Sequence, residues 1–416
     1  MRAPTLATLL ALLGGCESSQ PLGSRPQFRV PGCEAVDHEA CDVRQATCQT
    51  RLLAVAACLR GEAPGPMPPV TLLTEAEYAA YLAAQQSGVS PSPEAMQAQH
   101  AYEQAFVLLG LVQPMAFSPA TTASEAVAFI WGQYRSQSKD ILIIDHGDVF
   151  DAESASPVLV HELVHLLQDR QIDLAAFQHA HFGSDEAVLS ADALIEGEAR
   201  MHETQYGATV LGIDPAKVDW VRRFQRVLEL DEQELLAAPS PYTRRRYTFP
   251  YEWGARYLNH IREAGGREAV RARLTMPPSD TRALMASVEG AVDEVAAAID
   301  VPAPAAPPGW TLIGSNSLGA FGMFLFLAKS TNSITGSGDL ALTWRADRLR
   351  VYTSASLATT VSWRIELDDP SSARTVAGVA LTALGSQSVA VKDATVLIAM
   401  TDGATDVAWA LGDATP

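Results

Sequence analysis

The sequence is short of positive charge. Its 416 residues include 30 Lys and Arg against 48 Asp and Glu, which gives a formal net charge of -18. Proteins that bind nucleic acid normally carry a basic face, and this composition supplies none. Hydrophobic residues make up 48% of the chain and charged residues 19%, which excludes a wholly disordered or collagen-like chain. The length suits two or three globular domains.

Long hydrophobic runs are also missing. After the first 16 residues no stretch of about 20 apolar residues occurs, so no membrane-spanning helix is expected. Residues 1–16, MRAPTLATLLALLGGC, have the pattern of a secretory signal peptide. Their end, Leu13-Gly14-Gly15-Cys16, resembles the lipobox of bacterial lipoproteins. The resemblance implies that Cys16 is lipidated and that the protein is exported to the cell envelope, on the outer membrane or facing the periplasm. An ordinary signal peptide with a chance cysteine is the alternative.

Cysteine is absent after residue 58. Apart from Cys16, the cysteines are Cys33, Cys41, Cys48 and Cys58. An exported, oxidising setting favours two disulfides among them, with three pairings open. A structural zinc site is the alternative, but it would lack a C-x-x-C pair. We expect residues 17–65 to form a tether and a small disulfide-stapled helical region.

A Pro-rich segment without charge, residues 301–309, predicts a stiff linker. Before it, residues 66–300 predict a mostly helical domain with a buried strand at 140–145 and a long helix over 154–171. After it, residues 310–416 predict a smaller α+β domain. Its expected elements are strands over 348–353 and 359–367, a helix over 375–384 and a strand pair within 388–400. The expected fold class is therefore α+β.

The central motif is His161-Glu162-Leu163-Val164-His165. On an α-helix, residues i and i+4 lie on one face, one turn apart, so the two imidazoles can bind one Zn²⁺. Glu162 can then accept a proton from a water molecule that the metal activates. The motif predicts a zinc site with Glu162 as its general base.

A catalytic zinc site needs a third protein ligand. The metzincin continuation is absent, because His165 is followed by Leu166-Leu167-Gln168. The sequence ALIEGEA about thirty residues later resembles the E-G-x-A setting of gluzincin-type zinc metallopeptidases, where a Glu on a second helix completes the site. The resemblance implies Glu196 as the third ligand, with Glu198 as the alternative. Three histidines are further candidates, namely His179, His181 and His202.

The stretches HELVHLLQDRQ and ALIEGEA also resemble uncharacterised lipoproteins and secreted peptidase-like proteins of bacteria. Two later segments share that resemblance, Pro250-Tyr251-Glu252-Trp253-Gly254 and Pro277-Pro278-Ser279-Asp280-Thr281. It implies a zincin-like fold for the helical domain, and it gives no substrate.

Further side chains are candidates for supporting roles. Peptide hydrolysis passes through an oxyanion, and Tyr251 is the first candidate to donate a hydrogen bond to it, with Tyr247 second. Carboxylates often orient the imidazoles that bind zinc. Asp169, one turn after the second histidine, and Asp192, one turn before the expected glutamate ligand, are the candidates for that role.

These features predict a zinc-dependent peptidase that acts on peptides or proteins at the bacterial cell envelope. The membrane would be reached through the lipid anchor only, and no nucleic acid is involved. A non-catalytic surface protein that keeps the zincin fold is one alternative, and a zinc hydrolase of a non-peptide amide is another. The complete H-E-x-x-H motif favours an enzyme, because a decayed enzyme often loses its Glu.

Overall fold

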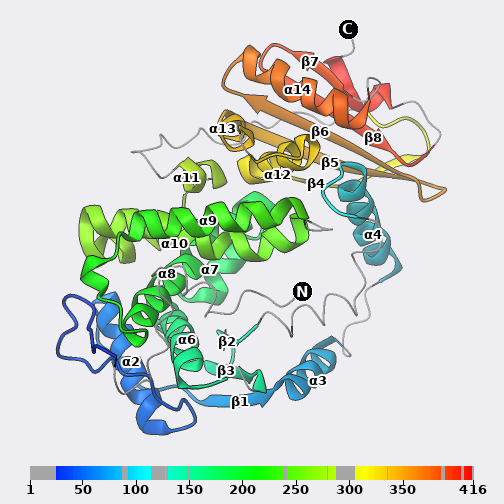
Figure 1. Ribbon diagram of the computed structural model, residues 1–416. Coiled ribbons are helices and arrows are strands. Elements are labelled where there is room, and N and C mark those ends of the chain that lie inside the picture. Colours follow the sequence, from blue (N-terminus) through cyan, green and yellow to red (C-terminus); the bar gives the residue numbers. More distant parts are fainter. Residues whose placement is uncertain are drawn as a thin grey trace.

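Two small sheets lie at opposite ends of the molecule, and helices fill the space between them (Figure 1). The computed structural model describes residues 25–86, 92–113, 127, 130–147, 150–237, 241–278, 280–286, 305–334, 336–385, 389–403 and 407–414. The architecture is α+β, as expected. Cys16 lies outside the described residues. Within them, no helix combines the length and apolar character needed to cross a membrane.

The first sheet has the strand order β1-β3-β2. Its central strand β3 (Asp140–Asp145) is the strand that the sequence predicted. β1 (Val70–Thr74) pairs with it in parallel, and β2 (Gly132–Arg135) pairs with it in antiparallel orientation. The apolar run of β3 is buried throughout, as is usual for a strand covered on both faces. The edge strands β1 and β2 are short and partly buried, and β2, with the sequence GQYR, shows no apolar alternation.

Helices form the middle layer. α6 (Ala152–Ile172) lies against β2 and β3, and α8 (Asp185–Val210) packs between α6 and α10 (Pro241–Arg273). A capping box between Asp151 and Ser154 starts α6. Side chains on nearly every side of α6 and α8 are buried, which fits helices in the interior of a domain. The remaining elements of this part are α3 (Glu75–Gln86), α4 (Pro93–Leu108), α7 (Leu174–Ala180), η3 (Pro215–Lys217), α9 (Trp220–Ala237) and α11 (Thr281–Ala286).

The second sheet is antiparallel with the order β4-β5-β6-β8-β7. Its strands are β4 (Trp310–Asn316), β5 (Trp344–Ser354), β6 (Thr359–Leu367), β7 (Val389–Lys392) and β8 (Thr395–Thr401). Its helices are α12 (Gly319–Thr331), α13 (Ser337–Ala341), α14 (Pro370–Leu384) and η5 (Ala408–Ala414). The expected strands, strand pair and helix correspond to β5, β6, β7, β8 and α14. The sequence analysis missed α12, whose residues from Gly319 to Ala328 are apolar and buried on every side, so that no polar face marks it as a helix.

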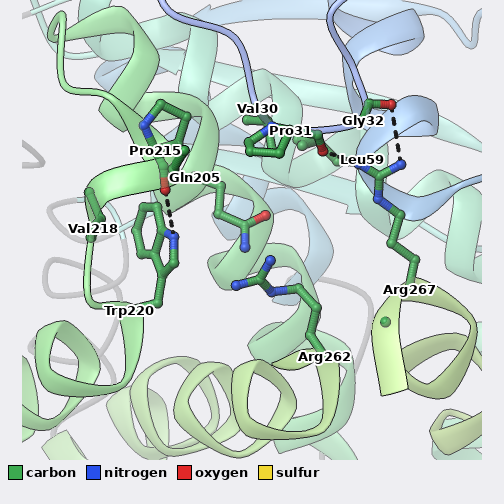
Figure 2. A pocket seen from close by; sticks show the side chains of 12 residues that line it. Val30, Pro31, Gly32, Leu59, Gln205, Pro215, Val218, Trp220, Arg262 and Arg267 are labelled. Carbon is green, nitrogen blue, oxygen red and sulfur yellow. Dashed lines mark hydrogen bonds between the residues drawn. The ribbon is translucent and has the colours of Figure 1, made fainter. Parts of the chain in front are cut away.

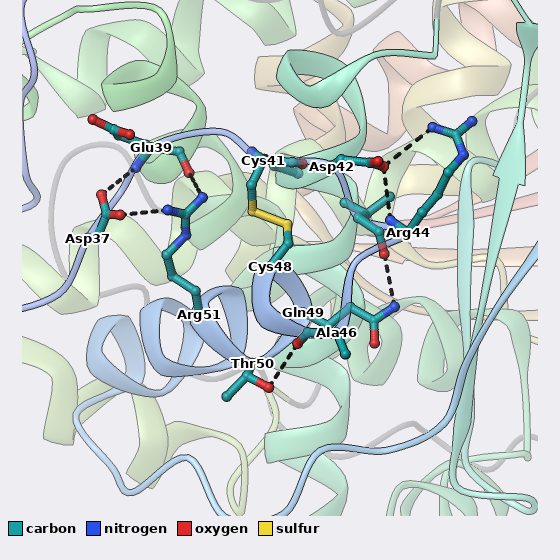
Figure 3. The surroundings of a disulfide bond; sticks show 12 residues. Asp37, Glu39, Cys41, Asp42, Arg44, Ala46, Cys48, Gln49, Thr50 and Arg51 are labelled. Carbon is teal, nitrogen blue, oxygen red and sulfur yellow. Dashed lines mark hydrogen bonds and ion pairs between the residues drawn. A yellow bond between two sulfur atoms is a disulfide. The ribbon is translucent and has the colours of Figure 1, made fainter.

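The cysteine-rich segment forms two disulfides around α2 (Ala46–Arg60). Cys33 pairs with Cys58 and Cys41 with Cys48, and Figure 3 shows the second pair with the ion pair of Arg51 and Asp37 beside it. The segment packs on the helical layer, because the hydroxyl of Ser156 on α6 bonds both the backbone N–H and the carbonyl of Cys41. Two disulfides fit an oxidising, exported environment.

One hydrophobic core joins the helical layer to the second sheet, with buried side chains from α8, α10, α12, β5 and β6 in a single cluster. Polar groups are buried at the same junction. Glu186, in the first turn of α8, accepts hydrogen bonds from the backbone N–H of Thr281 at 2.6 Å and from the Thr281 hydroxyl. Gly319 faces this carboxylate with φ +73°, and a Cβ there would overlap it. Burial raises the pKa of Glu186 well above its ordinary value, and the nearby Asp347 raises it further.

This raised pKa predicts how stability depends on pH. Because the folded state holds the Glu186 proton more tightly than the unfolded state does, wild-type stability should fall as the pH rises above the ordinary carboxyl pKa. In Glu186→Gln the side chain is neutral at every pH. The difference in free energy of unfolding between Glu186→Gln and wild type should therefore change with pH. It should shift in favour of the variant by roughly 1 kcal/mol or more as the pH rises from 5 to 8. Chemical denaturation at both values measures this, with Glu268→Gln on the exposed surface as the control. A difference that is the same at both pH values would contradict the prediction.

Candidate metal centre

The two histidines of the motif lie one helical turn apart on α6 and face α8. His161, Glu162 and His165 are each less than a tenth exposed. Glu196 comes from the middle of α8 and is partly open to solvent, with 25% of its side chain exposed. The two helices pack against each other, so residues that are 35 positions apart in the sequence meet at one place.

Three ligand atoms converge there. His161 Nε2 lies 3.0 Å from His165 Nε2 and 3.2 Å from Glu196 Oε2, and His165 Nε2 lies 3.3 Å from the same carboxylate oxygen. Ligands of a tetrahedral zinc ion, bound at about 2.0–2.1 Å, are about 3.3–3.4 Å from one another. The triangle therefore has nearly the size of one face of a zinc tetrahedron. In the described part of the chain, this is the group of His and carboxylate side chains that could hold a metal ion.

The other ring nitrogens determine which way the imidazoles face. His161 Nδ1 donates to Glu203 Oε2 at 3.1 Å, and His165 Nδ1 donates to Gln168 Oε1 at 2.8 Å. With each proton on Nδ1, both Nε2 lone pairs point at the Glu196 carboxylate and at each other. Three electron-rich atoms this close repel one another unless a proton or a metal ion lies between them, so the donor set fits a divalent metal ion.

The electrostatics of the site agree with this. Burial disfavours a charged imidazole, but hydrogen bonds to Glu196 and Glu203 raise the pKa of His161 to about 10. Burial likewise disfavours the charged carboxylate, but His165 and His161 hold the pKa of Glu196 well below its ordinary value. Both shifts favour positive charge at the imidazoles beside a charged Glu196 carboxylate, which is compatible with a cation at this place.

The structure distinguishes between the two candidate glutamates. Residues two apart on a helix point to different sides, and Glu198 is fully buried away from the ligand triangle. Its Oε1 accepts from Arg60 Nε at 2.9 Å, and its Oε2 accepts from Gln168 Nε2 at 2.9 Å. Glu198 therefore holds the glutamine that orients His165. Sequence reasoning missed Arg60, which the disulfide-linked helix α2 supplies.

The predicted role of Asp169 needs correction. Its Oδ2 accepts from the Tyr134 hydroxyl and from Lys139 Nζ, both at 2.6 Å, and its Oδ1 accepts from the Leu174 N–H. Asp169 thus ties β2 and the end of α6 together. Glu203 and Gln168, and not Asp169, are the partners of the two Nδ1 atoms. The role predicted for Asp192 stays a prediction.

The other candidate histidine on α8 lies outside the ligand triangle. His202 Nδ1 contacts Gln205 Oε1 at 3.3 Å, and burial lowers the pKa of His202 to about 4. It is a neutral, buried histidine, and the described cluster of ligands does not include it.

Glu162 lies between the metal ligands and the edge of the first sheet. Its Oε2 accepts from the Tyr134 backbone N–H at 2.6 Å. A Cβ at Gly132 would overlap the Glu162 carboxylate, so a glycine is needed where β2 passes this side chain. Burial raises the pKa of Glu162, and the two ligand histidines oppose the shift. A raised carboxyl pKa suits a group that accepts and returns a proton near neutral pH.

Tyr251 is brought to the site by close packing of two helices. A Cβ at Gly197 would overlap the backbone of Gly254, and a Cβ at Gly254 would overlap the Ala193 carbonyl, so these glycines let α8 and α10 touch. Tyr251, one turn before Gly254, stacks on His161 with ring centroids 5.7 Å apart. Burial, followed by the charges of Glu196 and Glu162, raises the pKa of its phenol well above the ordinary value. The side chain of Tyr247, the second candidate, lies outside the described residues.

Comparison with known proteins does not assign the chain to a family. No protein-family model matches the chain, and neither the curated proteins nor the solved structures include one that is significantly similar.

The hydrogen bond from His161 to Glu203 predicts a measurable effect on metal binding. Removal of the acceptor in Glu203→Ala frees the His161 ring to turn, and zinc affinity should fall by about 10- to 100-fold. Competition with a chromogenic chelator measures the dissociation constant. Asp169→Ala removes a buried carboxylate from a neighbouring position that touches neither imidazole, and its zinc affinity should stay within about threefold of wild type. Equal losses in the two variants would contradict the assignment.

Proposed function

We propose that this protein is a zinc hydrolase of the bacterial cell envelope, with a zincin-like fold, that cleaves peptide bonds. The observation that carries the proposal is the convergence of His161 Nε2, His165 Nε2 and Glu196 Oε2 within 3.3 Å of one another. Glu162, which follows His161 in the sequence, is buried beside these atoms.

Each side chain of the site has its own role in the proposed hydrolysis. His161, His165 and Glu196 would hold the zinc ion, which when bound supplies Lewis acidity. Glu162, buried and with a raised pKa, accepts the proton of the attacking water and returns it to the leaving amine. Tyr251 keeps its proton because its pKa is raised, so it can donate a hydrogen bond to the oxyanion of the transition state.

A peptide substrate is supported by the position of β2. Among the described strands, β2 pairs only with β3, and its backbone contacts Glu162 through Tyr134. An extended peptide could bind to the other backbone groups of such an edge. Its backbone would then pass the general base, which is the placement that peptide-bond hydrolysis requires.

The zincin-like fold is supported by the order of the elements around the site. The helix with the histidine motif lies against a small sheet that has an antiparallel edge strand, and a second helix brings Glu196 opposite the histidines. This agrees with the resemblance of the two motifs to gluzincin-type peptidases. The signal-peptide pattern of residues 1–16, with its lipobox-like end at Cys16, and the two disulfides support export and attachment to the membrane through a lipid.

Glu162→Gln tests the proposal, because the amide keeps the shape of the side chain but cannot accept a proton. The variant should retain one zinc ion per chain and lose at least about 10²-fold in the rate of peptide cleavage. Elemental analysis after purification without chelator and digestion of a broad peptide library provide the two measurements. Glu229→Gln, at a half-exposed side chain on α9, should cleave like wild type.

Three outcomes would count against the proposal, and they differ in what they reject. Wild-type protein without bound zinc would reject the metal centre. Cleavage that persists in Glu162→Gln would reject the general base. A wild-type protein that binds zinc but cleaves no peptide would reject peptidase activity and favour a binding role or a non-peptide amide substrate.

A further inference from the structure

A pocket of about 410 Å³ lies where the C-terminal half of α8 meets the N-terminal segment, η3 and α10 (Figure 2). None of the residues that line it belongs to the metal centre. Apolar side chains form much of its wall, among them Leu59, Pro31, Pro215, Val218 and Trp220. Its volume is in the lower part of the range of about 300–1,000 Å³ that is usual for pockets that bind small molecules.

The charged side chains that line this pocket are both cations. Arg262 and Arg267 reach it from α10, and no Asp or Glu belongs to its lining. Burial lowers the pKa of Arg262; Glu263 opposes this shift, and the charge of Arg267 adds to it. The two guanidinium groups therefore influence each other across a space without acidic residues in its wall.

A buried amide nitrogen also faces the pocket. Gln205 is only 2% exposed, and its Oε1 is held by His202 Nδ1 at 3.3 Å. The Nε2 group points into the pocket on the side of Arg262 (Figure 2), and it has no hydrogen-bond partner among the described residues. Leaving a buried donor unpaired costs free energy, which an acceptor bound in the pocket would recover.

The hydrogen bonds of the two arginines leave donors available. Arg262 donates from Nε and Nη2 to Asn259 Oδ1, which holds its guanidinium in place but uses neither hydrogen of Nη1. Arg267 donates to the Pro31 carbonyl at 2.7 Å and so shapes the opposite wall. The pocket thus combines positioned donors on one side with apolar surface on the other.

We propose that this pocket binds a small, soluble organic anion whose carboxylate or phosphate head lies between Gln205 and Arg262. The apolar part of the ligand lies against Pro215 and Val218. Oxyanions accept several hydrogen bonds at once, and guanidinium groups match their geometry better than any other side chain.

Calorimetric titration of the purified protein tests the ligand class. The soluble probes are hexyl phosphate, hexanoate, inorganic phosphate and hexanol, and vesicles of anionic phospholipid are titrated in parallel. At least one of the two hexyl anions should bind with a stoichiometry of one. That anion should bind at least about tenfold more tightly than hexanol, which lacks the charge, and more tightly than inorganic phosphate, which lacks the chain. Equal binding of hexanol, or binding only to vesicles of anionic phospholipid and to no soluble probe, overturns the proposal.

Two matched pairs of variants test the location. Ala216→Glu places a carboxylate at the exposed rim, whereas Ala216→Gln has the same size without the charge. Arg262→Gln removes a guanidinium from the pocket, whereas Arg226→Gln removes one from the exposed surface of α9. The first member of each pair should weaken binding of the better hexyl anion at least about tenfold, and the second less than about threefold. Equal affinities within both pairs overturn the proposal. Zinc content should be unchanged in all four, so this result is separate from that of the metal centre.

Discussion

The candidate site depends on two hydrogen bonds behind the metal ligands. Glu203 and Gln168 accept the Nδ1 protons of His161 and His165, and this turns both Nε2 lone pairs toward Glu196. Without these acceptors the rings could turn, and two histidines and a glutamate at suitable spacing would not make a site. The rest of the helical layer serves to bury these acceptors and to keep them in place.

Each acceptor is linked to an arginine, Glu203 directly to Arg200 and Gln168 to Arg60 through Glu198. Arg200 donates to Glu203 and also to Glu252, and Arg60 donates to Glu198, which accepts from Gln168. Buried charges are tolerated when they are paired and hydrogen-bonded, and removal of one partner is costly. Arg60 comes from α2, which the Cys33–Cys58 disulfide fastens to the start of the described chain. The cysteine-rich segment therefore supplies a side chain that supports the candidate site.

Local patterns in the sequence predicted the local features of the site and fold. The i, i+4 spacing placed His161 and His165 on one face, and the apolar run at 140–145 marked the central strand β3. Gln168 and Glu203 could have been found in the same way, because each lies seven residues after a ligand, on the same helical face. Arg60 could not, because it meets Glu198 across 138 positions. Asp169 was misassigned since helical spacing alone does not reveal Tyr134 and Lys139, which approach it from β2 and the turn that follows β2.

The most direct measurement is anomalous diffraction at the zinc absorption edge, from crystals of the protein purified without chelator. The account predicts one strong peak, about 2.0–2.2 Å from each of His161 Nε2, His165 Nε2 and Glu196 Oε2, with Glu198 still bound to Arg60. A well-ordered site without an anomalous peak, or a peak whose ligands are other side chains, would contradict it.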